Sequence, residues 1–89
     1  MKITWDKDKN EKLKCERGIS FEYIVEVLGQ KKDILGIVPN PSAKYPHQKI
    51  FVVRMLDYTW AVPFVETDGV IKLVTAFKSR KMHKTYEGR

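Results

Sequence analysis

Three apolar, β-branched segments in the second half of the chain constrain the fold most. They cover residues 50–56, 59–65 and 70–77, and only a few residues separate one from the next. Asp68-Gly69 lies between the second and third segments and is the strongest turn signal in the chain, typical of a hairpin between antiparallel strands. Pro63 cannot donate a hydrogen bond to a sheet, so we expect a bulge or an edge there. The sequence therefore predicts an antiparallel sheet.

Two helices are predicted ahead of this sheet. Asp6 is a plausible N-cap for a helix that runs to about Arg17, and Gly18 can end that helix. Ser20 is a second N-cap candidate, and the apolar residues after it recur at helical spacing. These apolar residues are Phe21, Ile24, Val25 and Leu28.

The remaining segments complete an α+β pattern. Residues 2–5 are interpreted as a short strand, 33–38 as a strand or irregular chain, and Ser79 as the cap of a short C-terminal helix. We expect two N-terminal helices packed on an antiparallel sheet of three to four strands, followed by that short helix. The length of 89 residues predicts a single domain over residues 1–89.

The residue types present exclude several classes of protein. No apolar run approaches the roughly 20 residues of a membrane helix, and the first residues do not look like a signal peptide. The single cysteine, Cys15, has no partner for an internal disulfide. We therefore expect a cytoplasmic protein that does not contact membranes. Two histidines and one cysteine do not make a structural zinc site, so we expect no metal and no other cofactor.

The positive charge is concentrated near the C-terminus. The formal net charge is +6, and residues 70–89 alone carry six Lys or Arg against one Glu. A concentrated positive field attracts phosphate backbones. His83 and Tyr86 lie among these cations, and rings between cations suit RNA, whose bases can stack on them. The alternative is a solvated basic tail that only aids solubility.

The order of several short motifs resembles one family. Trp5-Asp6 precedes a Lys-rich helix, and the second helix opens with Gly-Ile-Ser-Phe-Glu at 18–22. A strand is then followed by Ser-Arg-Lys at 79–81 and a late Tyr86. This order resembles the BrnT-type toxins of bacterial type II toxin–antitoxin modules, within the RelE/ParE-like group of ribonuclease toxins. The chain departs from the family at 16–18, where Glu-Arg-Gly replaces Lys-His-Gly, so it resembles a divergent branch.

The resemblance implies a fold, an activity and partners. It implies a RelE-like fold and a hydrolase that cleaves RNA without a metal ion and thereby inhibits translation. The partners implied are a cognate antitoxin protein and RNA, with free RNA and ribosome-associated RNA as the two alternatives. Operator DNA would be bound only through the toxin–antitoxin complex.

The residues of the C-terminal segment suit such chemistry. Metal-free RNA cleavage uses the neighbouring 2′-OH as nucleophile, so the protein must move protons and neutralise the phosphate. Arg80 can hold a phosphate by two parallel hydrogen bonds, and Lys81 adds a compact charge. Lys78 and Lys84 would extend this nucleic-acid-binding surface. The alternative is that these cations bind acidic residues of the antitoxin.

His83 and Tyr86 are the candidates for proton transfer. An imidazole ordinarily titrates near neutral pH, and His83 follows Arg80 by three residues, which places both on one face of a helix. Tyr86 would act as an acid or base, or stack on an RNA base. The alternatives are an ordinary exposed histidine and a tyrosine that anchors the tail to the sheet. The sequence does not identify the general base.

Two further cations are expected on the open face of the sheet. Arg54 and Lys72 lie within apolar strands and are candidates for nucleic-acid binding, with pairing to a carboxylate as the alternative for Arg54. Trp60 and Phe64 share one strand face and are interpreted as core residues. Cys15 has no neighbouring base in its helix, which argues against a thiol nucleophile.

A second class of function stays open. The same fold could carry a non-enzymatic module that binds RNA or DNA, or one that only docks an acidic protein. A nuclease would lose turnover on substitution of either Arg80 or His83, whereas a pure binder would lose affinity mainly through Arg80.

Overall fold

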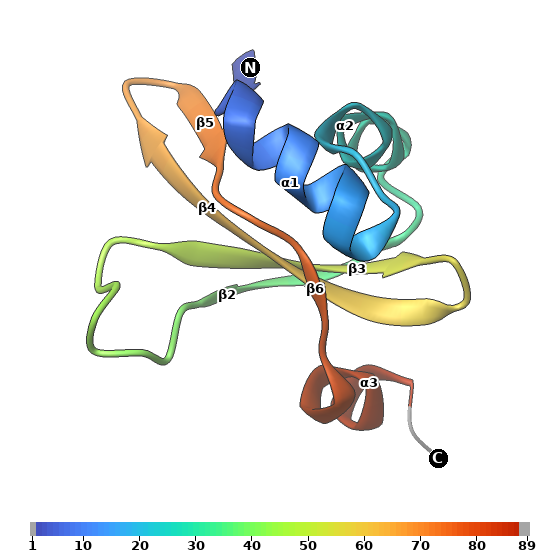
Figure 1. The fold of residues 1–89 in the computed structure, drawn as a ribbon. Helices are drawn as coiled ribbons and strands as arrows, with labels where there is room; N and C mark the ends of the chain where they lie inside the picture. Colours follow the sequence, from blue (N-terminus) through green and yellow to red (C-terminus); the bar gives the residue numbers. More distant parts are fainter. Residues whose placement is uncertain (1, 88–89) are drawn as a thin grey trace.

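The computed structural model describes residues 2–87 and has an α+β architecture (Figure 1). Within these residues, three helices and six strands follow one another along the chain. Their order is β1 (Lys2–Trp5), α1 (Lys7–Arg17), α2 (Phe21–Gln30), β2 (Ile34–Pro39), β3 (Lys49–Met55), β4 (Tyr58–Thr67), β5 (Val70–Leu73), β6 (Phe77–Lys78) and α3 (Arg80–Tyr86). None of these helices is long and apolar enough to cross a membrane.

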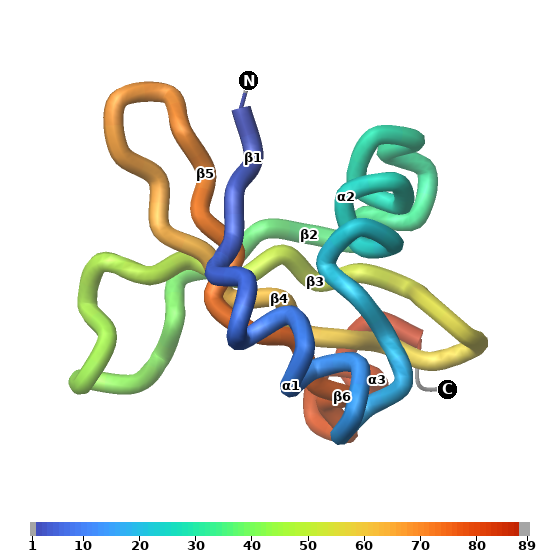
Figure 2. Tube along the Cα trace, turned by 45° about the horizontal axis from the view of Figure 1, so that its top comes forward, coloured from blue at the N-terminus to red at the C-terminus, as the bar shows by residue number. Residues whose placement is uncertain are grey.

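The sheet is mixed and larger than predicted. Its strand order is β1-β5-β4-β3-β2, and β6 also pairs with β4. The pairs β2–β3, β3–β4, β4–β5 and β4–β6 are antiparallel, whereas β1 runs parallel to β5. Figure 2 shows β1 and β5 side by side at one end of the molecule. The predicted count of three to four antiparallel strands was wrong, because residues 2–5 pair in parallel with the distant residues 70–73 and the third apolar segment splits into β5 and β6.

Pro63 explains why the third apolar segment splits into β5 and β6. On one edge, β4 pairs with β5 through residues 64–67 and with β6 through residues 60–61. Pro63 lies in the gap between these two partners, and its carbonyl accepts a hydrogen bond from the Val74 N–H at 2.9 Å. A proline has no N–H for a sheet ladder. The interruption of pairing therefore falls where the sequence predicted an irregularity.

The predicted caps form in all three helices. The Asp6 carboxylate accepts hydrogen bonds from the N–H groups of Asp8 and Lys9, and Gly18 ends α1 with φ of 65°. The Ser20 hydroxyl caps α2, and the Ser79 hydroxyl caps α3. These side chains satisfy N–H groups that have no partner within the helix. The predicted bounds of α1 and the predicted start of α2 are confirmed, and α2 ends at Gln30.

Helices α1 and α2 cover one face of the sheet, and the main core lies beneath them (Figure 1). Trp60 and Phe64 are buried in this core, as predicted, with 2% and 3% of their surfaces exposed. The indole N–H of Trp60 donates to the Met55 carbonyl oxygen at 3.0 Å. Helix α3 lies on the opposite side of the sheet from α1 and α2.

Asn10 joins the two N-terminal helices, a role that the sequence did not reveal. Its side chain is buried, accepts a hydrogen bond from the Phe21 N–H and donates one to the Glu22 carboxylate, both at 2.8 Å. The bond from Asn10 is the main cause that holds the pKa of Glu22 below its ordinary value of 4.5. Folding therefore favours the ionised form of the Glu22 side chain.

The Glu22→Gln variant is expected to have a shallower acid dependence of stability than wild type. Because the pKa of Glu22 is lower in the folded than in the unfolded chain, its contribution is present above pH 4.5 and is lost as the pH falls through the folded pKa. Urea denaturation at neutral pH and at a series of pH values below 4.5 measures this difference. If the free energy of unfolding fell equally steeply with decreasing pH in both proteins, the prediction would be contradicted.

The β3–β4 turn contains an unexpected conformation. Leu56 and Asp57 both have positive φ, 52° and 60°, and Leu56 is 61% exposed. Tight hairpin turns require this geometry, but Asn and Gly adopt it with less strain than a leucine. By contrast, the β4–β5 turn carries Asp68-Gly69, as predicted, with φ of 52° and 79°.

Replacing Leu56 with asparagine is expected to raise the free energy of unfolding by about 0.5–1 kcal/mol, because asparagine tolerates positive φ. Leu56→Ala serves as the control, since alanine removes the exposed side chain but keeps the strain. Chemical denaturation measures both variants. A Leu56→Asn protein no more stable than Leu56→Ala would show that backbone strain is not relieved.

Candidate functional site

Helix α3 lies on the sheet with one face half-buried. Met82, His83 and Tyr86 form this face, and the Ser79 N–H donates to the Thr59 carbonyl oxygen of β4 at 3.0 Å. Three of the other four residues of the helix are exposed cations, namely Arg80, Lys81 and Lys84. The C-terminal segment is therefore a docked helix with an exposed cationic surface.

His83 is held on the sheet by two neighbours. Its Nδ1 lies 3.0 Å from the hydroxyl oxygen of Thr59, a residue that is fully buried. Its ring stacks on Tyr58, with the ring centroids 4.0 Å apart and the planes 10° from parallel. The bond at Nδ1 leaves Nε2 as the nitrogen that can exchange a proton with a ligand. The ring is thus oriented by the sheet and is not a free histidine of the tail.

Lys78 of β6 brings a positive charge to the same place. Its ammonium group lies 5.7 Å from the centroid of the Tyr58 ring and 5.9 Å from that of the Trp60 ring. Cations are attracted to aromatic faces at such distances. We call Tyr58, Thr59, Lys78 and His83 the His83 cluster.

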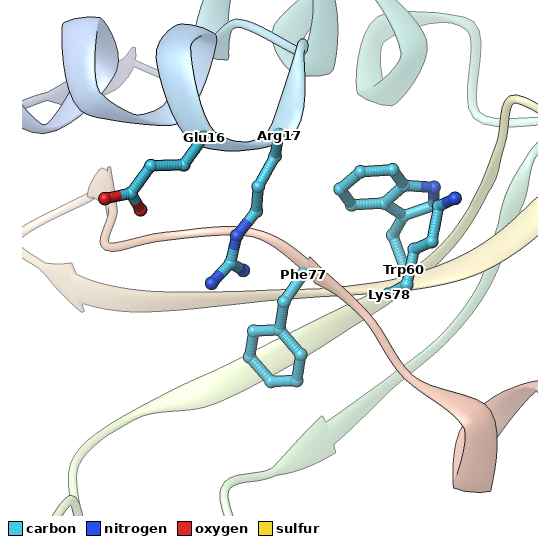
Figure 3. A pocket seen from close by; sticks show the side chains of 5 residues that line it. All are labelled: Glu16, Arg17, Trp60, Phe77 and Lys78. Atoms are coloured by element: carbon cyan, nitrogen blue, oxygen red, sulfur yellow. The ribbon is translucent and has the colours of Figure 1, made fainter.

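A pocket of about 500 Å³ adjoins this cluster between α1 and β6. Figure 3 shows its lining side chains, with Arg17 reaching down from the end of α1 toward β6, and Lys78 beside Trp60. The Arg17 guanidinium donates to the Ala76 carbonyl oxygen at 2.7 Å. A second cation from the first helix therefore lines a pocket together with Lys78, and the Glu16 carboxylate lines the same pocket.

Tyr86 packs against the second strand. A Cβ atom added to Gly36 of β2 would lie 3.0 Å from the Tyr86 hydroxyl oxygen, so the missing side chain at 36 makes room for this ring. The contact matches the alternative interpretation of Tyr86 as an anchor of the tail. It fixes the C-terminal end of α3 over β2.

Arg54 is paired with carboxylates. Its guanidinium forms an ion pair with Glu87, just after α3, and lies 3.7 Å from the Asp57 carboxylate. Arg54 also faces Thr59 across the β3–β4 ladder. It lies near the His83 cluster, but its charge is compensated there.

Lys72 lies far from the cluster. It pairs with Val65 on β4, six residues along the strand from Thr59, which corresponds to roughly 20 Å. Near Lys72, the pKa of Asp6 is held below 3.8, mainly by the hydrogen bond from the Lys9 N–H and in smaller part by the charge of Lys72. The structure thus groups Lys78 and His83 around Tyr58 and leaves Lys72 apart. Arg80 is exposed on α3, three residues before His83.

Tyr58, Thr59 and Arg17 are the site residues that sequence reasoning missed. The first two lie at the start of a strand that reads as core, and Arg17 reads as the end of a surface helix. No local pattern distinguishes them, because their role depends on where α3 and β6 dock.

The His83 cluster can bind an anion and transfer a proton, because an imidazole and an ammonium group lie beside aromatic rings. Within residues 2–87, no three His, Cys, Asp or Glu side chains are grouped so that they could hold a metal ion. Comparisons of the chain with protein-family models, curated proteins and solved structures find no match.

Proposed function

We propose that this protein is the toxin of a type II toxin–antitoxin module, a divergent relative of the BrnT-type toxins with a RelE-like fold. Its activity would be metal-independent cleavage of RNA, which inhibits translation in the cytoplasm. The observation that supports this best is the placement of His83, which Thr59 and Tyr58 orient, with the Lys78 ammonium group against the same Tyr58 ring. The motif order of the sequence adds to it.

The proposed reaction assigns a role to each group. The 2′-OH of one nucleotide loses its proton, and its oxygen attacks the adjacent phosphorus atom while the bond from phosphorus to the 5′-oxygen breaks. The leaving 5′-oxygen takes up a proton, which yields a 2′,3′-cyclic phosphate and a 5′-hydroxyl. Lys78 and Arg80 neutralise the phosphate oxygens, and Nε2 of His83 exchanges a proton with the reacting oxygens.

The exposed cations of α3 fit the proposed partners. Arg80, Lys81 and Lys84 are all exposed, so they are accessible to an RNA backbone and to acidic residues of an antitoxin. An antitoxin that covers this surface would inhibit by excluding RNA. Binding of operator DNA would then pass through the antitoxin complex.

A second candidate function is RNA binding without cleavage. It is favoured by the position of Tyr86, whose ring packs on Gly36 of β2. Of the two residues predicted for proton transfer, only His83 then belongs to the cluster. Stacking rings and cations alone suffice to hold single-stranded RNA.

Cleavage of total RNA in the presence of EDTA separates the two functions. The wild-type protein is expected to cleave RNA, and Arg80→Ala to cleave it about tenfold to a hundredfold more slowly, the effect of losing a charged hydrogen bond. Lys72→Ala is the matched control, since it removes an equal charge at the remote end of the sheet. RNA left intact by the wild type, both free and on translating ribosomes, would favour the binding module.

A further inference from the structure

A second groove lies on the other side of β6 and has no role in the proposed chemistry. It has a volume of about 600 Å³ and is formed by the loop between β2 and β3, the outer face of β3 and β4, the link into β6 and the start of α3. Buried Ile50 and Pro63 belong to it. A cavity of this size suits one planar group of a ligand with its substituents.

Two aromatic side chains line this groove and remain exposed. Tyr45 is 48% exposed and Phe77 is 37% exposed, although both carry a large aromatic ring. The loop that carries Tyr45 is ordered by its own hydrogen bonds, since the Tyr45 N–H donates to Ser42 O and its carbonyl accepts from the Gln48 N–H, both at 3.1 Å. Asn40 and Gln48 close the loop through their side chains at 3.0 Å. The ring is thus presented by a preorganised segment.

The charge around the groove selects the ligand. Lys9 and Lys81 line it, and none of its lining residues within the described chain is Asp or Glu. Two cations and two exposed rings surround an apolar floor, and this arrangement is complementary to a flat group that carries negative charge. A nucleotide of a single strand has this chemistry, because its base is unpaired and its phosphate is anionic.

We infer that this groove binds one unpaired base of the RNA, stacked against Tyr45 or Phe77, with the flanking phosphate on Lys81. The inference rests on the proposed RNA substrate, and it adds a base-binding subsite separate from the His83 cluster. Lys81 and Met82 line the groove while His83, the next residue, faces Thr59. A strand that crosses the start of α3 would therefore reach both sites, and the groove would select single-stranded over double-stranded RNA.

The test measures binding without cleavage. The probe is a fluorescein-labelled single-stranded RNA with 2′-O-methyl riboses, which lacks the 2′-OH nucleophile, titrated with the wild-type protein and its variants. Tyr45→Ala is expected to weaken binding by about five- to a hundredfold, the effect of one lost stacking contact. Tyr45→Phe is expected to restore it. Tyr23→Ala on α2 removes another tyrosine, 37% exposed, and is expected to change nothing.

The further outcomes test the base-binding groove separately from the proposed cleavage of RNA. Tyr45-dependent binding in a protein that leaves natural RNA intact would uphold the groove and overturn the nuclease. Binding by Tyr45→Ala and Phe77→Ala within twofold of wild type would overturn the groove, whatever the cleavage activity. If Tyr45→Ala weakened the binding of a duplex of the same sequence as much as the binding of the single strand, that result would also overturn the inference. A third result would also overturn the inference: a polyglutamate peptide that binds through Tyr45 while RNA binding does not depend on Tyr45. The groove would then serve an acidic protein.

Discussion

The His83→Ala variant is expected to cleave RNA about 10²–10⁴-fold more slowly than the wild type, the usual contribution of a general acid or base. The physical reason is the orientation of the ring. Thr59 binds Nδ1 and Tyr58 holds the ring plane, so Nε2 is presented in one position. Single-turnover cleavage of a labelled RNA at saturating protein measures the chemical step apart from binding.

The other histidine provides the matched control. His47 lies exposed in the loop between β2 and β3 and is not one of the residues of the His83 cluster, so His47→Ala is expected to keep the wild-type rate. RNA affinity of the His83→Ala protein should stay within a few-fold of wild type, because the cations remain. Wild-type turnover by His83→Ala would remove the nuclease mechanism, and a matching loss of affinity would assign His83 to binding.

Replacing Trp60 with alanine is expected to lower the free energy of unfolding by about 3–5 kcal/mol, typical of a large buried ring removed from a core. Trp60 is only 2% exposed and lies on the sheet face beneath α1 and α2. The neighbouring strands and helices cannot collapse into so large a space, so a cavity remains. Chemical denaturation followed by circular dichroism measures the change.

Trp60→Phe distinguishes volume from hydrogen bonding. Phenylalanine keeps most of the ring but loses the bond from the indole N–H to the Met55 carbonyl oxygen. We expect a smaller loss, about 1–2 kcal/mol, since one buried acceptor would lack its partner. A loss below about 1 kcal/mol in Trp60→Ala would show that the ring does not fill the core.

The sequence was sufficient for the local elements. Asp6, Ser20 and Ser79 cap helices as predicted, and Asp68-Gly69 forms the predicted turn. These features depend on hydrogen bonds and φ angles within a few residues, so the residue type alone carries the information. The helical spacing around Phe21 likewise identified Phe21, Ile24 and Leu28 as buried residues of α2, whereas Val25 is half-buried and the buried Val27 was not predicted.

The sheet was only partly predictable. The parallel pairing of β1 with β5 joins residues 2–5 to residues 70–73, and nothing local in either segment names the other. The short β6 forms because β4 has a free edge beyond Pro63, where Trp60 and Ala61 pair with Lys78 and Phe77. Strand partners of this kind are chosen by the packing of the whole domain.

The candidate site shows the same division. The concentration of positive charge near the C-terminus predicted Lys78 and the other cations there, together with His83 and Tyr86, as candidate site residues. Only the tertiary structure placed His83 on Thr59 and Tyr58, turned Arg54 toward Glu87, and separated Lys72 from the rest. Residue type determines what chemistry a side chain can perform, whereas distance and orientation decide which side chains act together. Those depend on where distant segments dock, because burial and pairing act across the whole domain rather than along the chain.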